Sequence, residues 1–584
     1  MIEKSERAWV LAWGILAGLA LYLLHRWIVT LTPETMRPHV LWPLYILVIS
    51  ISLTMQMMSS HRSEPLMWIS SVSFGLIMAA ASSYIAFQTW TGKAGPVEYR
   101  HPASTLHILS VVSTCWFVLM PFAQHRLART TWFGDYGILF SNAWGNAVKL
   151  ATSILFVVLF WGLLFLWAGL FEILKIDLIT HVLSKQIFIY PATSLALSIG
   201  LALYSAKEEV VVGIYRAALN VLGSLLPLVA LIATLFLLSL PFTGIQGLWR
   251  TGIATPLMTT LLVAFVFFLN TAWQDYRQGI NLPGWLLRFV SLCIFVMPIY
   301  SMLCAYSLGL RVTQYGWSLG RFWGAMIIVV LAIYSFGYAV ASMKRRVVWM
   351  DDARKVNIFA AFAICVLLTL TATPLLDPTR MVVDSQIERL MSGKTAPDDF
   401  DFSYLRFKSG KYGNDRLHEL ADVSGHAQND RIRALAMAQI KRKDAPGRIF
   451  DVATLNESEM SQKIELYPET ATLEPQFLRA LLKQINDRKM MPRCFSSDFP
   501  CQVWLVDLDG DHVDEIVFFD SFSSQVFGIE DGAWVKLGSV VSSGQRAAVG
   551  RNVARALRAG DARVVPNRWQ DFQLGPDRYS IVGE

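Results

Sequence analysis

Long apolar runs, separated by short polar connections, fill the chain as far as residue 376. A helix needs about 20 mostly apolar residues to cross the hydrocarbon core of a bilayer. Eleven runs meet this requirement, at residues 9–29, 40–58, 67–89, 103–122, 149–173, 187–205, 219–240, 252–270, 286–308, 322–342 and 356–374. The pattern predicts an all-α polytopic transmembrane helix bundle over residues 1–376, with the lipid bilayer as its partner. Prolines inside two of the runs, Pro227 and Pro298, predict kinks.

From residue 377 the pattern becomes typical of a water-soluble domain. Amphipathic periodicity predicts helices at residues 378–393, 412–423, 428–443, 473–487 and 544–558. Short segments of strand character, separated by turn signals, predict strands at Gln502–Val506, Glu515–Phe519, Gln525–Ile529 and Ala533–Leu537, with a last pair of strands closing the chain. Residues 377–584 are therefore predicted to form a C-terminal soluble α+β domain with a small antiparallel sheet.

Composition agrees with this division of the chain. Hydrophobic residues make up 54% of the chain and charged residues 16%, whereas about 25% of residues are charged in ordinary soluble proteins. The net charge of +7 is explained by Lys and Arg in loops, as is usual in membrane proteins. The sequence has no basic tract with interleaved aromatic residues, so nucleic acid is not expected as a partner.

The distribution of Lys and Arg predicts the orientation of the bundle. The first run has no small-residue cleavage site, so we expect it to be retained as a helix rather than removed as a signal peptide. With a cytoplasmic N-terminus, the loops on that side carry about fifteen Lys and Arg residues against about eight on the other side, which is the bias that the positive-inside rule requires. An odd number of spans then predicts a periplasmic C-terminal domain in a bacterial inner membrane.

Two features within the membrane region carry structural predictions. The connection at residues 123–148 mixes aromatic, apolar and polar residues without reaching spanning length, which predicts a helix lying along the interface, with an active-site lid as the alternative. Gly162 and Gly169 share one face of the following run, where small residues permit close helix packing.

An acidic segment between two predicted strands is the strongest local signal for a metal. Oxygens from Asp507, Asp509 and Asp511, the carbonyl of Val513 and the carboxylate of Glu515 have the spacing with which a loop closes around one calcium ion. The pattern is similar to the calcium loops of integrin-type β-propeller repeats, although His512 stands where Gly is usual and only one copy is present. The alternative is a tight hairpin whose acidic side chains face solvent.

Two cysteines lie outside the membrane region, at Cys494 and Cys501. In an oxidising compartment they would close a small loop, and the chain-entropy model gives such a disulfide about 2–3 kcal/mol of stabilisation. The alternative is two unpaired thiols in a cytosolic domain. A zinc site is not expected, because no second cysteine pair or histidine cluster accompanies them.

The central parts of the eleven runs carry almost no Asp, Glu, Lys or Arg. A charge at the centre of a span is costly and is usually kept for function, so this absence argues against an ion-coupled transporter. His107 is expected to be an interfacial histidine, with a site shared with Cys115 as the alternative. An envelope enzyme would need a polar cleft, built from His101, His107 and the acids at residues 398–401.

Two stretches carry a resemblance to a known family. They are Asn142–Lys149 (NAWGNAVK) running into Leu159–Phe171 (LFWGLLFLWAGLF), and Phe400–Gly413 (FDFSYLRFKSGKYG). Over most of residues 1–425 the chain resembles a bacterial family of multi-spanning inner-membrane proteins, domain of unknown function 4153. The resemblance implies the membrane architecture and supplies no activity.

Together these observations predict a bacterial inner-membrane protein without catalytic residues. Its helix bundle would anchor a periplasmic interaction or sensing domain that contacts an envelope protein. Two alternatives stay open: a passive transporter or channel component with a regulatory soluble tail, and an envelope enzyme that acts on lipid-linked substrates.

Overall fold

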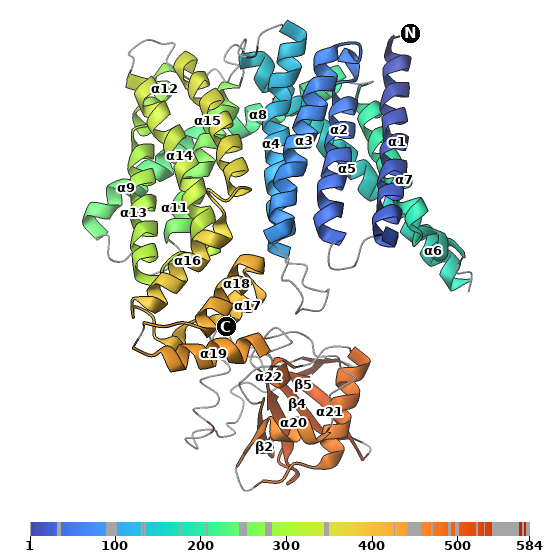
Figure 1. Cartoon of the computed structure of the whole chain (residues 1–584), viewed down its shortest axis with the longest axis vertical. Coiled ribbons are helices and arrows are strands. Elements are labelled where there is room, and N and C mark those ends of the chain that lie inside the picture. The colour runs from blue at the N-terminus through green and yellow to red at the C-terminus, as the bar shows by residue number, and fades with distance from the viewer. Residues whose placement is uncertain are drawn as a thin grey trace. The chain divides into compact units, whose positions relative to one another are not determined.

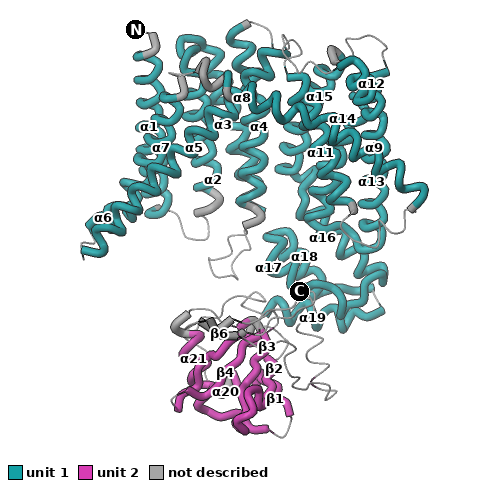
Figure 2. The backbone as a smooth tube through the Cα atoms, turned by 180° about the vertical axis from the view of Figure 1, so that it is seen from behind, with its two compact units in different colours: residues 1–441 teal, residues 442–584 magenta. Residues whose placement is uncertain are grey.

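The computed structural model describes most of the membrane region and the core of the C-terminal region (Figure 1). The described residues are 2–31, 37–88, 102–129, 132, 136–174, 178–205, 208–243, 254–274, 283–343, 350–425, 427–441, 457–468, 471–488, 492–496, 501–520, 524–530, 532–539, 557, 572–574 and 577–579. They form two compact units, residues 1–441 and 442–584 (Figure 2).

Within the described residues, eleven helical segments are long and apolar enough to cross a membrane. They are α1 (Ile2–Leu31), α2 (Arg37–Met57), α3 (Pro65–Gln88), α4 (Pro102–Arg129), α5 (Tyr136–Ile173), α7 (Gln186–Ser205), α8 with α9 (Glu208–Gly223 and Leu226–Thr243), α11 (Ala254–Trp273), α12 with α13 (Gly284–Cys293 and Val296–Tyr315), α14 (Leu319–Met343) and α15 (Met350–Thr371). Each covers all or most of one of the predicted apolar runs, so the predicted bundle is confirmed. The short helix α6 (Leu178–Leu183) lies between α5 and α7.

Two of the eleven segments are broken, and both breaks come just before a mid-run proline. The α8–α9 segment is interrupted between Gly223 and Leu226, ahead of Pro227, and the α12–α13 segment between Cys293 and Val296, ahead of Pro298. A proline has no N–H to donate and its ring clashes with the carbonyl four residues earlier, so the helix ends there and restarts. The predicted kinks are confirmed.

Helix α5 differs from the prediction for the connection at residues 123–148. Residues 136–148 do not form a separate interfacial helix; they are the first turns of α5, which continues for 38 residues. No proline interrupts this stretch, and a helix of this length spans roughly 57 Å at 1.5 Å per residue. It exceeds the hydrocarbon core of about 30 Å.

Glycine-mediated packing occurs at a different place from the one predicted. A Cβ added at Gly162 or Gly169 would meet nothing within 4 Å, so these glycines face open space in this chain. Instead, a Cβ at Gly14 would lie 2.0 Å from Ser198 Oγ, and one at Gly18 would lie 2.5 Å from Pro191 Cα. These two glycines are four residues apart on one face of α1, and they let α1 approach α7 closely.

The membrane helices form two groups that lie side by side in the views of Figures 1 and 2. One group contains α1–α5 and α7, and the other contains α9 and α11–α15, with α4 packed against α15 between them. Each group has its own buried apolar cluster, around Met55 and Trp116 in the first and around Phe265 and Tyr300 in the second. Among the described residues, α15 makes hydrogen bonds to the first group through Thr371, which contacts His107 of α4, and through Asn357, which contacts Tyr136 of α5.

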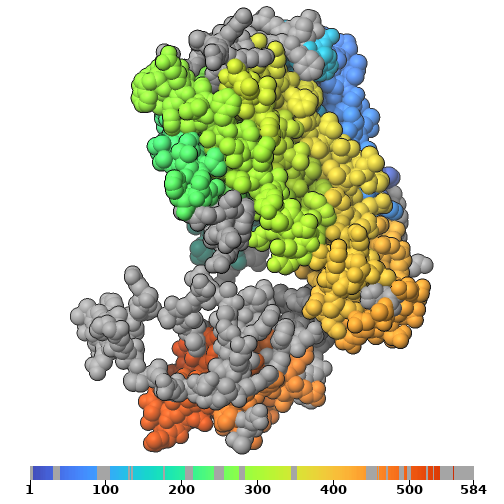
Figure 3. Space-filling view, turned by 90° about the vertical axis from the view of Figure 1, so that its left-hand side faces the viewer, coloured from blue at the N-terminus to red at the C-terminus, as the bar shows by residue number. Residues whose placement is uncertain are grey.

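Four further helices pack on the end of the bundle that lies opposite the N-terminus (Figure 1). These helices, here called the helical cap, are α16 (Pro378–Met391), α17 (Phe402–Phe407), α18 (Gly410–Ala421) and α19 (Asn429–Lys441). They share an apolar core around Val383, Leu417 and Ile432. Because α16 contacts α14 and α18 contacts α3, the cap continues the surface of the membrane helices (Figure 3). The first compact unit thus ends at residue 441, whereas composition changes at residue 376.

The second unit is an α+β domain whose main sheet has the strand order β1-β2-β3-β4-β5. The strands are β1 (Ile464–Tyr467), β2 (Cys501–Val506), β3 (Glu515–Phe519), β4 (Ser524–Glu530) and β5 (Ala533–Ser539). Strands β2–β5 pair antiparallel, as predicted, but the edge strand β1 pairs parallel to β2, so the sheet is mixed. Strand β1 was not predicted. A parallel neighbour is joined by a long crossover rather than by a short turn, so no hairpin signal marks it in the sequence.

The core of this domain lies between the sheet and its helices. Those helices are α20 (Glu457–Gln462), α21 (Pro475–Arg488) and α22 (Arg493–Ser496). Phe477, Phe518 and Phe527 are among its fully buried side chains. Strands β6 (Phe572–Leu574) and β7 (Asp577–Tyr579) form a separate antiparallel pair. Apart from Leu557, the predicted helix at residues 544–558 lies outside the described residues.

Candidate functional site

A small polar cavity of about 70 Å³ lies where the membrane helices meet the helical cap. Its walls come from α3, α4, α14, the end of α15, the start of α16, and α17 with the start of α18. All of these elements belong to the first compact unit. A cavity of this size holds a few water molecules or one small group, so its chemistry depends on the side chains that line it.

Asp377 is the central side chain of this cavity and is 5% exposed. One of its oxygens, Oδ1, accepts from the backbone N–H groups of Thr379 at 2.8 Å and Arg380 at 3.3 Å, so Asp377 is the N-cap of α16. The other oxygen, Oδ2, accepts from the Tyr84 hydroxyl at 2.8 Å, and Gln88 donates to that hydroxyl at 3.0 Å. A helix N-terminus stabilises a carboxylate, so this buried charge is satisfied by hydrogen bonds.

His107 lines the same cavity and connects three membrane helices. Its Nε2 lies 2.8 Å from the Thr371 hydroxyl on α15, and its ring meets the Trp323 ring of α14 edge to face at 5.3 Å. Cys115 lies eight residues after His107 in α4, and its sulfur lies 3.8 Å from the Thr369 hydroxyl of α15. Among the described residues, His107 and Cys115 make no contact with each other. The alternative of a shared histidine and cysteine site is therefore not supported.

The segment Tyr404–Gly413 brings the cap side of the cavity together. Ser409 is buried and donates to the Leu405 carbonyl at 2.9 Å, and a Cβ at Gly413 would lie 1.7 Å from the Ser409 oxygen. Gly410 has a φ of 61°, in the left-handed region that favours glycine. Burial, and then the negative charges of Asp401 and Asp377, raise the pKa of Tyr404 to about 12. Its hydroxyl is therefore neutral at physiological pH.

The acids that an envelope enzyme would need do not join this cavity. Asp398 pairs with Arg431 of α19 at the surface of the cap, and Asp401 caps α17 by accepting from the Tyr404 N–H at 2.9 Å. His101 lies outside the described residues. Of the residues proposed for that enzyme, the structure places His107 alone in the described wall of the cavity.

A second set of contacts clamps α16 to the turn between α13 and α14. Gln386 donates to the Trp317 carbonyl at 2.7 Å, and Arg389 donates to the Gln314 carbonyl at 2.6 Å. In return, the Trp317 N–H donates to the Ser385 hydroxyl at 3.1 Å. The bond from Arg389 satisfies a carbonyl in the last turn of α13, where carbonyls have no partner within the helix. The cavity and this clamp together form a polar joint that fixes the cap to the bundle.

The acidic segment forms the turn between β2 and β3. Carboxylate oxygens of Asp507, Asp509 and Asp511 all lie within 4.8 Å of one another. Glu515 is buried, and its Oε2 accepts from the Leu508 N–H at 2.7 Å. The loop's own N–H groups, first that of Gly510 at 2.6 Å, hold the pKa of the Asp507 carboxyl below its usual value. The loop thus holds three carboxylates close together.

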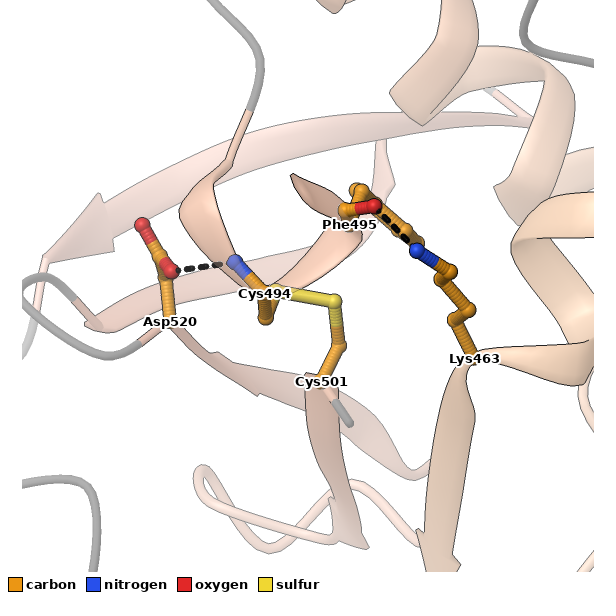
Figure 4. The surroundings of a disulfide bond; sticks show 5 residues. All are labelled: Lys463, Cys494, Phe495, Cys501 and Asp520. Carbon is orange, nitrogen blue, oxygen red and sulfur yellow. Dashed lines mark hydrogen bonds between the residues drawn. A yellow bond between two sulfur atoms is a disulfide. The ribbon is translucent and has the colours of Figure 1, made fainter. Parts of the chain in front are cut away.

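Cys494 and Cys501 are joined in a disulfide that is buried against the sheet (Figure 4). Their Cα atoms lie 4.9 Å apart. The Cys494 N–H donates to Asp520 Oδ1 at 3.0 Å, and Lys463 donates to the Phe495 carbonyl at 2.6 Å. The predicted pairing is present, and it ties α22 to the first residue of β2.

Comparison with known families identifies the membrane region. The family model described as Domain of unknown function (DUF4153) matches residues 41–421, which is more than half of the chain. The chain belongs to the DUF4153 family. The match covers ten of the eleven membrane-spanning segments of the described chain and the cap as far as α18. No curated protein and no solved structure matches the chain.

The DUF4153 match includes the polar joint and ends before the disulfide and the acidic loop. Sequence reasoning missed Tyr84 and Asp377 as members of a common site. One local signal could have found Asp377, because an Asp directly before Pro378 is typical of an N-cap followed by a helix-starting proline. Nothing local could have found Tyr84, which is 293 residues away in the chain.

Proposed function

We propose that this DUF4153 protein is a multi-pass protein of the bacterial inner membrane that anchors a periplasmic α+β domain. In this proposal the C-terminal domain is an interaction or sensing module that contacts another envelope protein. The single observation that carries it is the odd number of spans among the described residues, with the N-terminus and the helical cap at opposite ends of the bundle (Figure 1).

Two independent observations support the periplasmic side for the C-terminal domain. The excess of Lys and Arg on the N-terminal side of the bundle favours a cytoplasmic N-terminus under the positive-inside rule. The disulfide between Cys494 and Cys501 is of the kind that persists in oxidising compartments and is rare in the cytosol.

The polar joint supports an anchoring role in which the bundle holds the cap rigidly. Asp377 is bonded to Tyr84 of α3 and at the same time caps α16, while Gln386 and Arg389 are bonded to the end of α13. A flexible tether would not require a buried carboxylate and two clamping side chains at its root. The joint therefore favours a helical cap that is fixed relative to the membrane helices.

Cysteine accessibility tests the topology. Leu537→Cys places a thiol at a position that is 48% exposed in the C-terminal domain, and Ser60→Cys places one at the exposed turn between α2 and α3. The four cysteines inside the spans are buried. A membrane-impermeant maleimide added to intact spheroplasts should label the Leu537→Cys protein and leave the Ser60→Cys protein unlabelled until lysis. The reverse pattern would contradict the proposal.

We also propose that the acidic loop binds calcium as a structural ion in this domain. The convergence of the Asp507, Asp509 and Asp511 oxygens supports it, because a calcium ion takes six to eight oxygen ligands. The probe is calcium alone, added to the purified full-length chain while the unfolding temperature is recorded. We expect an increase at millimolar calcium or below, removed by EDTA and absent in Asp509→Asn. An unchanged unfolding temperature would exclude the site.

A further inference from the structure

A second cavity, of about 240 Å³, lies between the two groups of membrane helices. Its walls come from α4, α5, α11, α14 and α15. Most of the lining is apolar, including Phe117, Phe140 and Ile358, and none of the described residues that line it is charged. At one end the lining becomes polar, with Tyr136, Asn270, Tyr334 and Asn357.

Asn270 and Asn357 of this lining form a closed ring of hydrogen bonds with Tyr338, which lies outside the lining. Asn270 Nδ2 donates to the Tyr338 hydroxyl at 2.9 Å, the Tyr338 hydroxyl donates to Asn357 Oδ1, and Asn357 Nδ2 donates to Asn270 Oδ1 at 2.6 Å. The remaining amide protons are also used, on the Val266 carbonyl at 2.8 Å and on the Tyr136 hydroxyl oxygen at 2.7 Å. Neither asparagine therefore has a proton left for a ligand.

Two phenolic protons remain at the polar end of the cavity. Tyr136 accepts from Asn357 and keeps its own O–H, for which the described residues offer no acceptor. The hydroxyl of Tyr334, which lines the same cavity, has no hydrogen-bond partner among the described residues. A donor left unpaired in an apolar environment is costly. Two such donors at one end of the cavity form a site for an uncharged acceptor oxygen.

The position of the cavity along the helices identifies the kind of acceptor. Asn357 lies near the start of α15, two residues after Lys355, and Tyr136 is the first residue of α5. Because the spanning segment of α15 begins at Asp352 and Asn357 is bonded to Tyr136, these residues lie near one edge of the hydrocarbon core. Ile358 and Ala361 lie deeper along α15 and line the apolar part. The ester carbonyls of membrane lipids lie at the edge, and their acyl chains extend inward.

We propose that this cavity binds one acyl chain of a membrane phospholipid, with its ester carbonyl accepting from the Tyr136 and Tyr334 hydroxyls. The volume is below the range of about 300–1,000 Å³ usual for sites that enclose a whole small molecule, which fits a chain segment and its carbonyl. The absence of charge in the described lining fits an ester and leaves the phosphate outside. This site does not depend on the function proposed for the C-terminal domain.

Photo-crosslinking in nanodiscs tests the site with the full-length protein. The probe is a phosphatidylethanolamine that carries a diazirine near the ester carbonyl of one acyl chain, mixed at low fraction into unlabelled phospholipid. Crosslinks mapped by mass spectrometry should concentrate on residues 117–122 of α4 and 357–361 of α15. Removing both donors with Tyr136→Phe and Tyr334→Phe should reduce these crosslinks about tenfold, given a few-fold loss for each neutral hydrogen bond.

A second variant separates a specific site from general lipid contact. Ala361→Trp fills the apolar part and should remove the crosslinks on α4 and α15 altogether. Crosslinks to the exposed face of α5 around Leu163 and Leu166 serve as an internal standard and should persist in a correctly folded bundle. The proposal would be overturned if the wild-type protein gave no crosslinks on α4 and α15. It would also be overturned if those crosslinks persisted in both variants while the α5 standard was unchanged.

Discussion

The membrane helices and the C-terminal domain differ in where they place many of their large apolar side chains. In the domain, Phe477, Phe518 and Phe527 are at most 1% exposed. In α5, Leu163 and Leu166 are 67% and 61% exposed, while Ser153 of the same helix is fully buried. Burial of apolar surface stabilises the domain because its solvent is water. In lipid that driving force is lost between helices, and close packing with polar contacts takes over.

The largest expected difference between the two regions comes from truncating an apolar side chain. Phe518→Ala leaves a cavity in the domain core and should lower its free energy of unfolding by about 3–5 kcal/mol. Leu166→Ala removes a side chain that faces lipid and should have an effect within about 0.5 kcal/mol. Urea-dependent limited proteolysis of the full-length protein measures both. Equal sensitivity at the two positions would contradict the contrast.

Loss of the disulfide should lower the free energy of unfolding by a somewhat smaller amount. We expect this loss in the C-terminal domain and not in the membrane helices. Replacing Cys494 and Cys501 by Ser should lower the stability of that domain by about 2–3 kcal/mol, because a closed loop restricts the unfolded chain. A reductant should produce the same loss in the wild-type protein and none in the double variant, as read by the same urea series. A wild-type domain that is insensitive to reductant would show that the pair does not stabilise it.

Close helix approach should matter in the bundle wherever a glycine meets its neighbour. Gly14→Leu forces a side chain into the contact with Ser198, where a Cβ already lies 2.0 Å from Oγ. Overpacking of this kind costs about 1–3 kcal/mol. Gly162→Leu is the matched control, since nothing lies within 4 Å there, and it should leave the thermal stability in detergent unchanged. A loss of stability in the control alone would reverse the assignment of the packing face.

The smallest effect at neutral pH concerns the hydroxyl of Tyr404 in the helical cap. Its pKa is raised to about 12 from a usual value of 10.0, mainly by burial. A raised pKa means that folding favours the protonated form, so this contribution is complete below pH 10 and is lost as the pH rises toward 12. Hydrogen exchange of α17 between pH 9 and 12 should show this loss, and Tyr404→Phe should remove this pH-dependent step.

Length and hydropathy were sufficient to predict the spans, because a continuous apolar run of this length has few alternatives. The strands β2–β5 were equally accessible, since each is bounded by turn residues such as those around Asp509 and Gly532. The parallel strand β1 could not be found in this way, because its register on β2 is set by a crossover rather than by a hairpin. The local pattern thus predicted where elements lie in the sequence better than it predicted which elements pack side by side.

The candidate sites were predictable only where their residues lie close together in the sequence. Asp507, Asp509 and Asp511 are near neighbours, and so are Cys494 and Cys501, so spacing alone suggested both groups. The polar joint unites Tyr84 with Asp377, and the intramembrane cavity unites Tyr136 with Asn357. Such pairs depend on the order in which helices pack, and one sequence carries no local record of that order.

The shortness of the connection between α15 and α16, residues 372–376, has a mechanical consequence. The last membrane helix runs almost directly into a helix that is bonded to α3 through Tyr84 and to the end of α13 through Gln386 and Arg389. Sliding of α15 along its axis would pull on these bonds, so we expect them to oppose a piston-like movement. We therefore expect a movement of the membrane helices to move the helical cap together with the bundle, as a common tilt.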